Sequence, residues 1–226
     1  MSGFCIKINA ENYNKGMDKL NAKDFWNKRA DHYDKSVNTT YADAYQKTID
    51  LAREHIKPDD NILAFACGTG IVSNALAENA KKVTAIDISD QMVANAKQKA
   101  DQENISNISY KVANLEDDEI QAGKYNVITA FNVLYFLKDL DKKLKLTYDM
   151  LPENGYFLSV TDCIPQRRSW KSFRMDILMK LKIVPYFRRM NPDDLTAYIE
   201  IAGFKIIRIE NLHPEPPNLF VVAQKQ

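Results

Sequence analysis

The sequence predicts an α/β fold with a doubly wound, seven-stranded sheet that is mostly parallel and carries an antiparallel last strand. Five short apolar runs alternate with helical patterns between residues 61 and 163, and such alternation favours parallel strands with helices on both faces. Two last apolar runs, 204–212 and 218–223, are joined by a short connection and are expected to pair antiparallel at the sheet edge. A glycine-containing turn after the first run indicates where a ligand would bind.

Length and composition indicate one domain of ordinary globular type. The chain has 226 residues, of which 45% are hydrophobic and 27% charged, enough to enclose a complete core. A formal net charge of +1 gives no global field that would attract nucleic acid, so no DNA partner is expected. The N-terminal segment lacks a cationic lead followed by an apolar core, and no run approaches the roughly 18 apolar residues of a membrane span. We therefore expect a cytoplasmic protein.

Cysteine and histidine residues are too scattered to predict a disulfide framework or a metal site. Cys5, Cys67 and Cys163 are odd in number and widely spaced, and the three histidines are equally dispersed. The local ligand spacing of a zinc site is therefore missing from the sequence. No metal is expected.

We expect residues 1–23 to form a polar N-terminal arm and residues 24–226 to form a single domain. Helical spacing of apolar residues over 24–57 predicts a lid of two helices, broken around residues 36–40. The other parts of the domain are a ligand-binding core over 58–164, a lid insertion over 165–191, and a closing helix with two strands over 192–226.

The centre of the predicted site is the turn Cys67–Gly70, which follows the strand 62–66. A strand that turns sharply into a helix beneath a ligand needs residues without bulky side chains, because the backbone approaches the ligand and can adopt positive φ. Gly68 and Gly70 provide that freedom. About 20 positions on, Asp87 ends the next apolar run, where a carboxylate can accept hydrogen bonds from both hydroxyls of a ribose. Alone, Asp87 could equally precede a helix N-terminus, but the glycine turn favours the ligand role.

The elements after Asp87 continue the alternation of helix and strand. They are a helix from Asp90 to about Asn104, a strand over 108–114, an acidic loop over 116–119, a strand over 125–133, a helix over 137–151, a strand over 156–163 and a helix over 193–202. The acidic run is assigned to a loop because a cluster of like charges is most simply solvated. The run 125–133 is continuously apolar, which is typical of a parallel strand covered on both faces.

The insertion over 165–190 combines an apolar stripe with an excess of positive charge. Between Arg167 and Arg189, eight Lys or Arg residues stand against one acid, Asp176. The stripe consists of Trp170, Phe173, Ile177, Leu181 and Val184. Such a segment could cap an anionic or amphipathic substrate, rest on an anionic membrane surface or contact RNA. The simplest interpretation is a packed lid helix whose basic residues are solvated.

Together these motifs resemble the class I S-adenosylmethionine-dependent methyltransferases, over about residues 24–226. The motifs that support the resemblance are ILAFACGTG, VTAIDIS, VANLED, YNVITAFNVLYFL and LPENGYFLSV, together with the closing strand pair. Trp26, Ala30 and Tyr33 also match the W-x-x-x-A-x-x-Y pattern of a small bacterial group within the family. The resemblance implies a Rossmann-like methyltransferase fold, S-adenosyl-L-methionine as cofactor and a small-molecule methyl acceptor.

The resemblance further implies roles for individual residues. Cofactor contacts are expected from Tyr33, Ala66, Cys67, Gly68, Thr69, Gly70, Asp87, Ile88, Asn114, Leu115 and Asn132. In this assignment the turn wraps the methionine part, Asp87 holds the ribose and Ile88 covers one face of the adenine. Asn114 replaces an aspartate of the family, and its amide oxygen can still accept a hydrogen bond. Tyr33 would close over the cofactor from the N-terminal helices.

Two positions depart from the family's first motif. Ala64 stands where the family has an acidic residue that helps hold the cofactor's amino group, and Ala66 stands where it has a glycine. Losing one hydrogen bond to a charged group costs on the order of 1.5–3 kcal/mol, or ten- to hundredfold in affinity. Ala66 is a mild change unless φ must be positive there. Ala64 leaves open an alternative, a non-catalytic or regulatory protein on a degenerate methyltransferase fold.

No motif identifies a catalytic group, since methyl transfer can rely on alignment and exclusion of water. Asn132, Tyr135 and Asp162 are candidates by position, each with an equally weighted structural interpretation as strand-end cap, core aromatic and loop carboxylate. A nicotinamide-dependent dehydrogenase is the rival enzyme class, but its glycine fingerprint is incomplete and no tyrosine has Lys four positions later. The sequence determines neither the acceptor and its methylated atom nor the oligomeric state.

Overall fold

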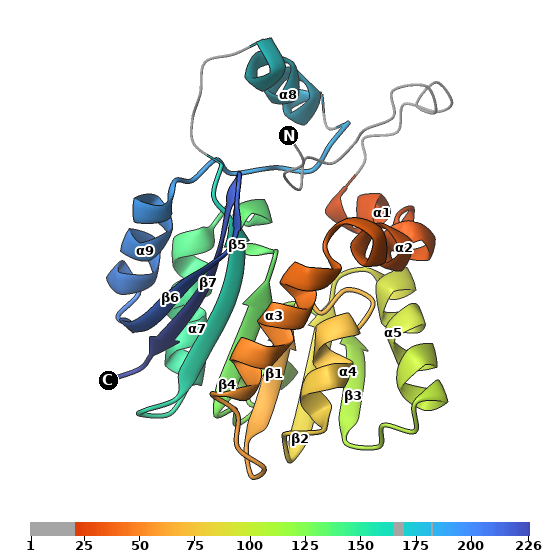
Figure 1. The fold of residues 1–226 in the computed structure, drawn as a ribbon, viewed down its shortest axis with the longest axis vertical. Helices are drawn as coiled ribbons and strands as arrows, with labels where there is room; N and C mark the ends of the chain where they lie inside the picture. The colour runs from red at the N-terminus through yellow and green to blue at the C-terminus, as the bar shows by residue number, and fades with distance from the viewer. Residues whose placement is uncertain (1–20, 165–169, 182) are drawn as a thin grey trace.

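The computed structural model describes residues 21–164, 170–181 and 183–226, so nearly all of the predicted N-terminal arm lies outside the described residues. A seven-stranded sheet has the order β3-β2-β1-β4-β5-β7-β6 (Figure 1). The strands are β1 (Asn61–Phe65), β2 (Lys82–Asp87), β3 (Ile108–Val112), β4 (Val127–Phe131), β5 (Tyr156–Asp162), β6 (Lys205–Pro214) and β7 (Pro217–Gln224). Strands β1 to β5 pair in parallel. Strand β7 runs antiparallel between β5 and β6, which confirms the predicted fold class.

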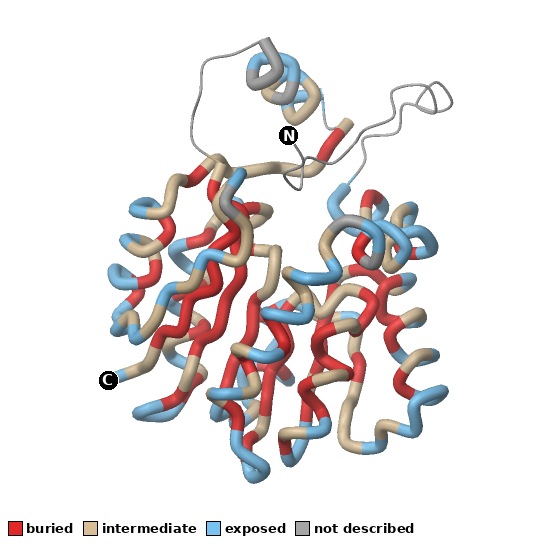
Figure 2. The backbone as a smooth tube through the Cα atoms, viewed as in Figure 1, coloured by how far each residue is buried: buried red, intermediate tan, exposed pale blue. Residues whose placement is uncertain are grey.

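Helices cover both faces of this sheet. They are α1 (Ala22–Asn27), α2 (Ala30–Thr40), α3 (Ala42–Arg53), α4 (Ile71–Ala77), α5 (Asp90–Gln102), α6 (Asp118–Gln121), α7 (Leu140–Met150), α8 (Trp170–Lys180) and α9 (Pro192–Ile201), with the 3-10 turn η2 (Leu134–Phe136). Alternate strand residues enter two separate cores, as the side-chain period of a strand requires. Leu63 belongs to the core under α7 and α9, and Ala64 to the core under α3, α4 and α5. The buried backbone in Figure 2 accordingly follows the central strands.

The lid contains three helices, where the sequence predicted two with a break around residues 36–40. Helix α2 continues through those residues and ends at Thr40, and Tyr41, with a φ of −128°, separates it from α3. Two hydroxyls inside the expected break bond back to the helix, Ser36 to the His32 carbonyl at 3.2 Å and Thr39 to the Lys35 carbonyl at 2.9 Å. The hydroxyl groups of these residues find hydrogen-bond acceptors within the helix, so the residues do not interrupt it.

The acidic loop predicted over 116–119 was wrong in its second half, where the short helix α6 begins. Asp118 and Glu119 occupy its first turn, where negative charge is favoured by the unpaired backbone N–H groups. Ile120 docks into the core and is almost fully buried. The buried anchor and the favourable helix end therefore outweigh the like-charge repulsion.

The insertion differs from the single apolar stripe that the sequence predicted. Helix α8 ends at Lys180, and Figure 1 shows it set apart from the sheet. Phe173, Ile177 and Leu181 are exposed, whereas Val184 is buried on the extended segment that follows. The last strands also extend further than predicted, to Pro214 and from Pro217, leaving a two-residue connection.

Replacing the two glycines of the turn after β1 by alanine should reduce the free energy of unfolding by different amounts. Both have positive φ, 55° at Gly68 and 82° at Gly70, but only at Gly70 would an added Cβ collide, lying 2.5 Å from the Tyr110 hydroxyl oxygen. Gly68→Ala should cost about 1–2 kcal/mol of unfolding free energy from backbone strain. Gly70→Ala should cost about 1–3 kcal/mol more because of overpacking. Urea unfolding of both variants checks this, and equal losses would contradict it.

Candidate functional site

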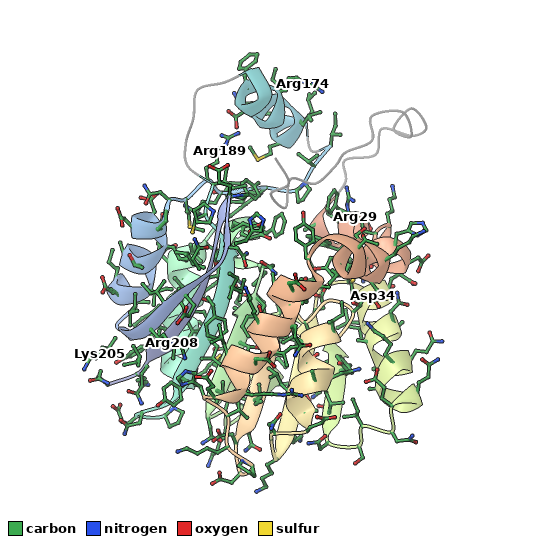
Figure 3. The ribbon with its side chains drawn as sticks, viewed as in Figure 1. Arg29, Asp34, Arg174, Arg189, Lys205 and Arg208 are labelled. Atoms are coloured by element: carbon green, nitrogen blue, oxygen red, sulfur yellow. The ribbon has the colours of Figure 1, made fainter. Side chains whose placement is uncertain are left out.

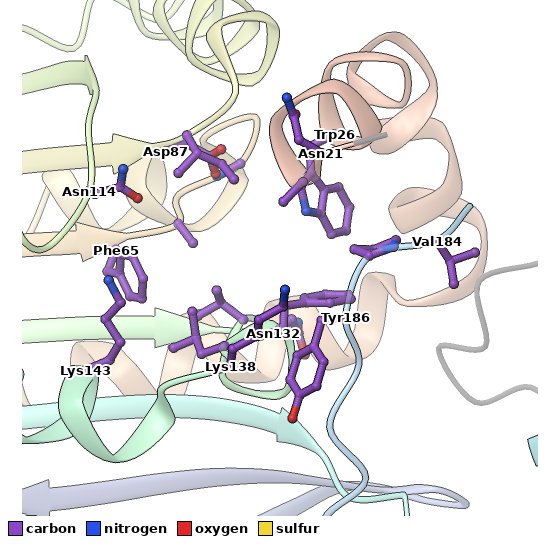
Figure 4. A pocket seen from close by; sticks show the side chains of 18 of the residues that line it. Asn21, Trp26, Phe65, Asp87, Asn114, Asn132, Lys138, Lys143, Val184 and Tyr186 are labelled. Atoms are coloured by element: carbon purple, nitrogen blue, oxygen red, sulfur yellow. The ribbon is translucent and has the colours of Figure 1, made fainter. Parts of the chain in front are cut away.

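A cavity of about 840 Å³ opens at the carboxyl ends of β1, β2 and β4, beneath the lid helices (Figure 4). This is the edge where open α/β sheets bind ligands, and the volume is in the range of small-molecule sites. Of the predicted cofactor contacts, it is lined by Tyr33, Ala66, Gly68, Asp87, Ile88, Asn114 and Asn132. The structure therefore brings together residues from five separate elements and loops around one space.

The turn from β1 into α4 has an unusual backbone. Ala66, Gly68 and Gly70 all have positive φ, with Ala66 at 53°. An L-residue with a side chain pays about 1–2 kcal/mol in this region. The condition under which Ala66 would be a mild replacement for glycine is thus not met, and the surrounding fold holds this residue in a strained conformation.

Asp87 fixes this turn from the neighbouring strand. Its Oδ2 accepts a hydrogen bond from the Gly68 backbone N–H at 3.0 Å, and its Oδ1 accepts one from the Ser89 N–H at 2.9 Å. The side chain is largely buried yet lines the cavity. Burial raises the pKa of Asp87, and the backbone donors act in the opposite direction. A carboxylate in this place retains lone pairs for further donors at the cavity wall.

The other predicted site residues occupy several environments. Cys67 and Thr69 line a recess of about 50 Å³ behind the turn, shared with Tyr33, Ala66 and Gly68. Gly70 packs against Tyr110, and Leu115 is fully buried in the core, so neither borders the large cavity. Tyr135 is fully buried between Phe136 and Phe187, with ring centroids 4.5 and 5.1 Å away.

Asn132 stands at the boundary between the large cavity and a second one. Its φ is 57°, a region that Asn tolerates better than most residues. It lines both the large cavity and a cavity of about 360 Å³ between α3 and the β6–β7 hairpin. Its side-chain oxygen accepts a long hydrogen bond of 3.4 Å from the Asn218 amide. One side chain therefore faces both spaces.

Asp162 is the buried carboxylate of the second cavity. The Asn218 amide donates to its Oδ1 at 2.7 Å, and Tyr45 and His213 line the same space. Burial raises the pKa of Asp162 to about 6, while Asn218 and His213 oppose the shift. The carboxyl group therefore changes charge close to neutral pH, which suits proton transfer.

The lid is fastened to the turn and to α5 by polar residues that sequence reasoning missed. Asp34 on α2 accepts a hydrogen bond from the Thr69 hydroxyl and pairs with Lys99 on α5 at 2.7 Å. On α1, the Asn27 amide donates to Asp90 at 3.0 Å. In the sequence, the spacing of these side chains does not distinguish them from solvated helix residues. The only available signal is the family pattern of Trp26 and Tyr33, which marks this segment as part of the site.

Two basic residues of the insertion have structural partners. Arg189 pairs with Asp176 at 2.8 Å, and the Arg188 guanidinium donates to the Lys138 carbonyl at 2.7 Å. Arg174, in contrast, lies on the exposed helix α8 (Figure 3). The insertion also contributes Met179, Lys180 and Tyr186, among others, to the wall of the large cavity. The basic residues of the insertion therefore include one that pairs within the insertion, one that contacts the loop before α7 and one on the exposed helix.

Within the described ranges, no group of three or more His, Cys, Asp or Glu side chains could hold a metal ion. No helix in the same part of the chain is long and apolar enough to cross a membrane. The expected cytoplasmic location stays a prediction.

The chain is similar to known methyltransferases over most of its length. A family model described as a methyltransferase domain matches residues 33–209. The ubiquinone biosynthesis O-methyltransferase of Coxiella burnetii (strain Dugway 5J108-111) is 25% identical, and the match covers 86% of this chain and 82% of that protein. The protein of the same description from Acinetobacter baumannii (strain AYE) is 26% identical, with coverage of 69% and 68%.

Solved structures agree with this similarity at the level of the fold. The structure described as a DhpI–SAH complex has a TM-score of 0.67 at 17% identity, covering 89% of this chain and 93% of that one. An S-adenosylmethionine-dependent methyltransferase from Aquifex aeolicus has a TM-score of 0.62 at 16% identity, with coverage of 79% and 89%.

Loss of the Asp34 contacts should loosen the lid without disturbing the sheet. Asp34→Ala should lower the opening free energy of α1 and α2 by about 1–2 kcal/mol, which corresponds to roughly 5- to 30-fold faster amide hydrogen exchange there. Lys35→Ala, which removes an exposed charged side chain on the same helix, is the control and should leave exchange unchanged. Equal exchange in both variants would show that Asp34 does not fasten the lid.

Proposed function

Since the chain belongs to the methyltransferase-domain family, whose model matches residues 33–209, we propose that it methylates a hydroxyl oxygen on a small aromatic molecule. The methyl donor is S-adenosylmethionine, and the chain is an enzyme of the small-molecule class. The oxygen as acceptor atom is supported by the relatives described as O-methyltransferases. Nothing in the comparisons supports the non-catalytic alternative.

The large cavity has the chemistry that the cofactor needs, and this observation is the main support for the proposal. Among its carboxylates, Asp87 lies beside the β1 turn, with apolar Ile88 and Met92 and the amide Asn114 nearby. The ribose hydroxyls need a hydrogen-bond acceptor such as the Asp87 carboxylate, and the adenine ring needs an apolar surface such as Ile88 and Met92. The strained turn allows the backbone to approach the ligand closely. We assign Asp87 to the ribose hydroxyls and Ile88 with Asn114 to the base.

Aromatic side chains on the opposite side of the cavity suit a flat acceptor. Trp26, Phe136 and Tyr186 line this part, and the Trp26 and Phe136 rings meet edge to face at 5.2 Å. Lys138 and Lys180 border the same space, so an anionic substituent on the acceptor would have a nearby counter-charge. The acceptor class that fits is an aromatic hydroxy compound, with or without an acidic group.

When bound, the cofactor would supply an electrophilic methyl group: the acceptor oxygen would form a bond to the methyl carbon as the carbon–sulfur bond breaks, and the electron pair of that bond would remain on sulfur. The protein aligns the acceptor and removes its proton, because a phenol with a pKa near 10 is protonated at neutral pH. We place the reacting hydroxyl at Asn132, which borders both cavities. Asp162 receives the proton, directly or through water held in the polar second cavity.

Tyr135, the remaining catalytic candidate, is not assigned a catalytic role. It lines neither the large cavity nor the cavity at Asp162 and has no accessible surface. Burial also raises the pKa of its hydroxyl, so it remains protonated and cannot serve as a base at neutral pH. We assign its ring to the aromatic packing that supports η2.

Asp87 should be required for cofactor binding. Asp87→Asn removes the charged acceptor and should weaken S-adenosylmethionine and S-adenosylhomocysteine about ten- to hundredfold. Isothermal titration calorimetry checks this, with Asp59→Asn, an exposed turn residue, as the control. Thermal unfolding confirms that the variant is folded. Unchanged affinity in folded Asp87→Asn would refute the ribose assignment.

Turnover should depend on ionised Asp162. With catechol or a hydroxybenzoate as acceptor, kcat/KM should rise with pH through about 6 and then level, because the protonated carboxyl cannot accept a proton. Asp162→Asn should lose about 10²- to 10⁴-fold in rate and retain cofactor affinity. Asp141→Asn, an exposed carboxylate on α7, should behave as the wild type. Asp162→Asn with the wild-type rate and pH profile would eliminate this base.

A further inference from the structure

Ala64 leaves a gap at the position where the family has an acidic side chain. On the sheet it is in register with Ala85 of β2 and Thr129 of β4. It belongs to the core that packs under α3, and Tyr45 of α3 packs against that core. The side chain of residue 64 therefore points from the sheet toward α3, beneath Tyr45.

The recess of about 50 Å³ lies at this gap. Ala64, Thr129, Tyr33 and Tyr45 line it, together with Cys67 and Thr69 of the turn. It shares Tyr33, Ala66 and Gly68 with the lining of the large cavity, so the two spaces adjoin. Its volume is enough for one small polar group or a water molecule.

Two phenol hydroxyls contribute to the polar surface of this recess, which Thr69, Ser73 and Thr129 also line. The hydroxyl oxygens of Tyr33 and Tyr45 are 2.9 Å apart and form one hydrogen bond. Burial raises the pKa of both groups, so both are neutral at physiological pH. In such a pair one oxygen donates and keeps lone pairs that can accept from a further donor. The Thr69 hydroxyl, which also lines the recess, donates to Asp34 and likewise keeps lone pairs on its oxygen.

We propose that the hydroxyl pair of Tyr33 and Tyr45 binds the ammonium group of the cofactor's methionine part, in place of the carboxylate that Ala64 lacks. A cationic ligand group needs an acceptor where the protein excludes water, and this pair provides one beside the β1 turn. The inference rests on the cofactor assignment made above. It explains how the chain tolerates Ala64 without losing its function.

The test compares two ligands that differ in the methionine part. S-adenosylmethionine has the ammonium group, whereas 5′-methylthioadenosine has the same nucleoside and no amino acid. Tyr45→Phe should weaken S-adenosylmethionine about tenfold or more and change 5′-methylthioadenosine affinity less than about twofold. Tyr148→Phe on the distant helix α7 is the matched control. Introducing the family's acid, Ala64→Asp, into Tyr45→Phe should restore most of the lost affinity.

Each calorimetric outcome is informative. Equal weakening of both ligands by Tyr45→Phe would overturn the inference, because the tyrosine would then only support the lid. Unchanged affinity for both would also overturn it, as would a wild type that binds 5′-methylthioadenosine but not S-adenosylmethionine. A wild type that binds neither ligand would instead refute the cofactor assignment itself. Thermal unfolding of each variant excludes loss of the fold.

Discussion

The candidate site depends on the hydrogen bond from the Gly68 backbone N–H to the Asp87 carboxylate. It ties the strained turn after β1 to the tip of β2 and keeps the carboxylate at the cavity wall. Ala66 shows how strongly the surroundings determine this turn, since it holds a positive φ that alanine disfavours. Strain of this kind persists where packing and hydrogen bonds outweigh it, and it is common at functional sites. The rest of the pocket is assembled around this fixed corner.

The lid is built onto the same corner, so closure and ligand binding are physically linked. Asp34 contacts the turn through Thr69, while Asn27 contacts the start of α5 through Asp90. A ligand that orders the turn would therefore also stabilise α2, because Asp34 joins that helix to Thr69 of the turn. The tyrosine pair extends this connection from α2 to α3. The lid thus contributes chemistry as well as cover, which is why the loss of an acid at residue 64 can be offset from another part of the chain.

Much of the fold could be predicted because it follows from local patterns. Continuous apolar runs specified the central strands, and the short connection between the last two runs specified the antiparallel pair. The errors occurred where tertiary contacts overrule local preference. Ile120 is buried and draws an acidic segment into α6, and Ser36 and Thr39 turn their hydroxyls onto their own helix. Phe173, Ile177 and Leu181 show the reverse, because a stripe at helical spacing does not have to meet a core.

The sequence by itself determined the family, the cofactor class and the position of the glycine turn, because glycines after a strand and an acid at the next strand's tip are local requirements of that chemistry. Only the tertiary structure decided which polar side chains meet. Tyr45 lies 19 residues before Ala64, and Asp162 is 30 residues from Asn132, so no spacing rule relates them. The packing of α3 on the sheet brings Tyr45 over Ala64, and the pairing of β5 with β7 brings Asn218 onto Asp162. Side chains so distant in sequence are brought together by long-range packing, which local patterns do not encode.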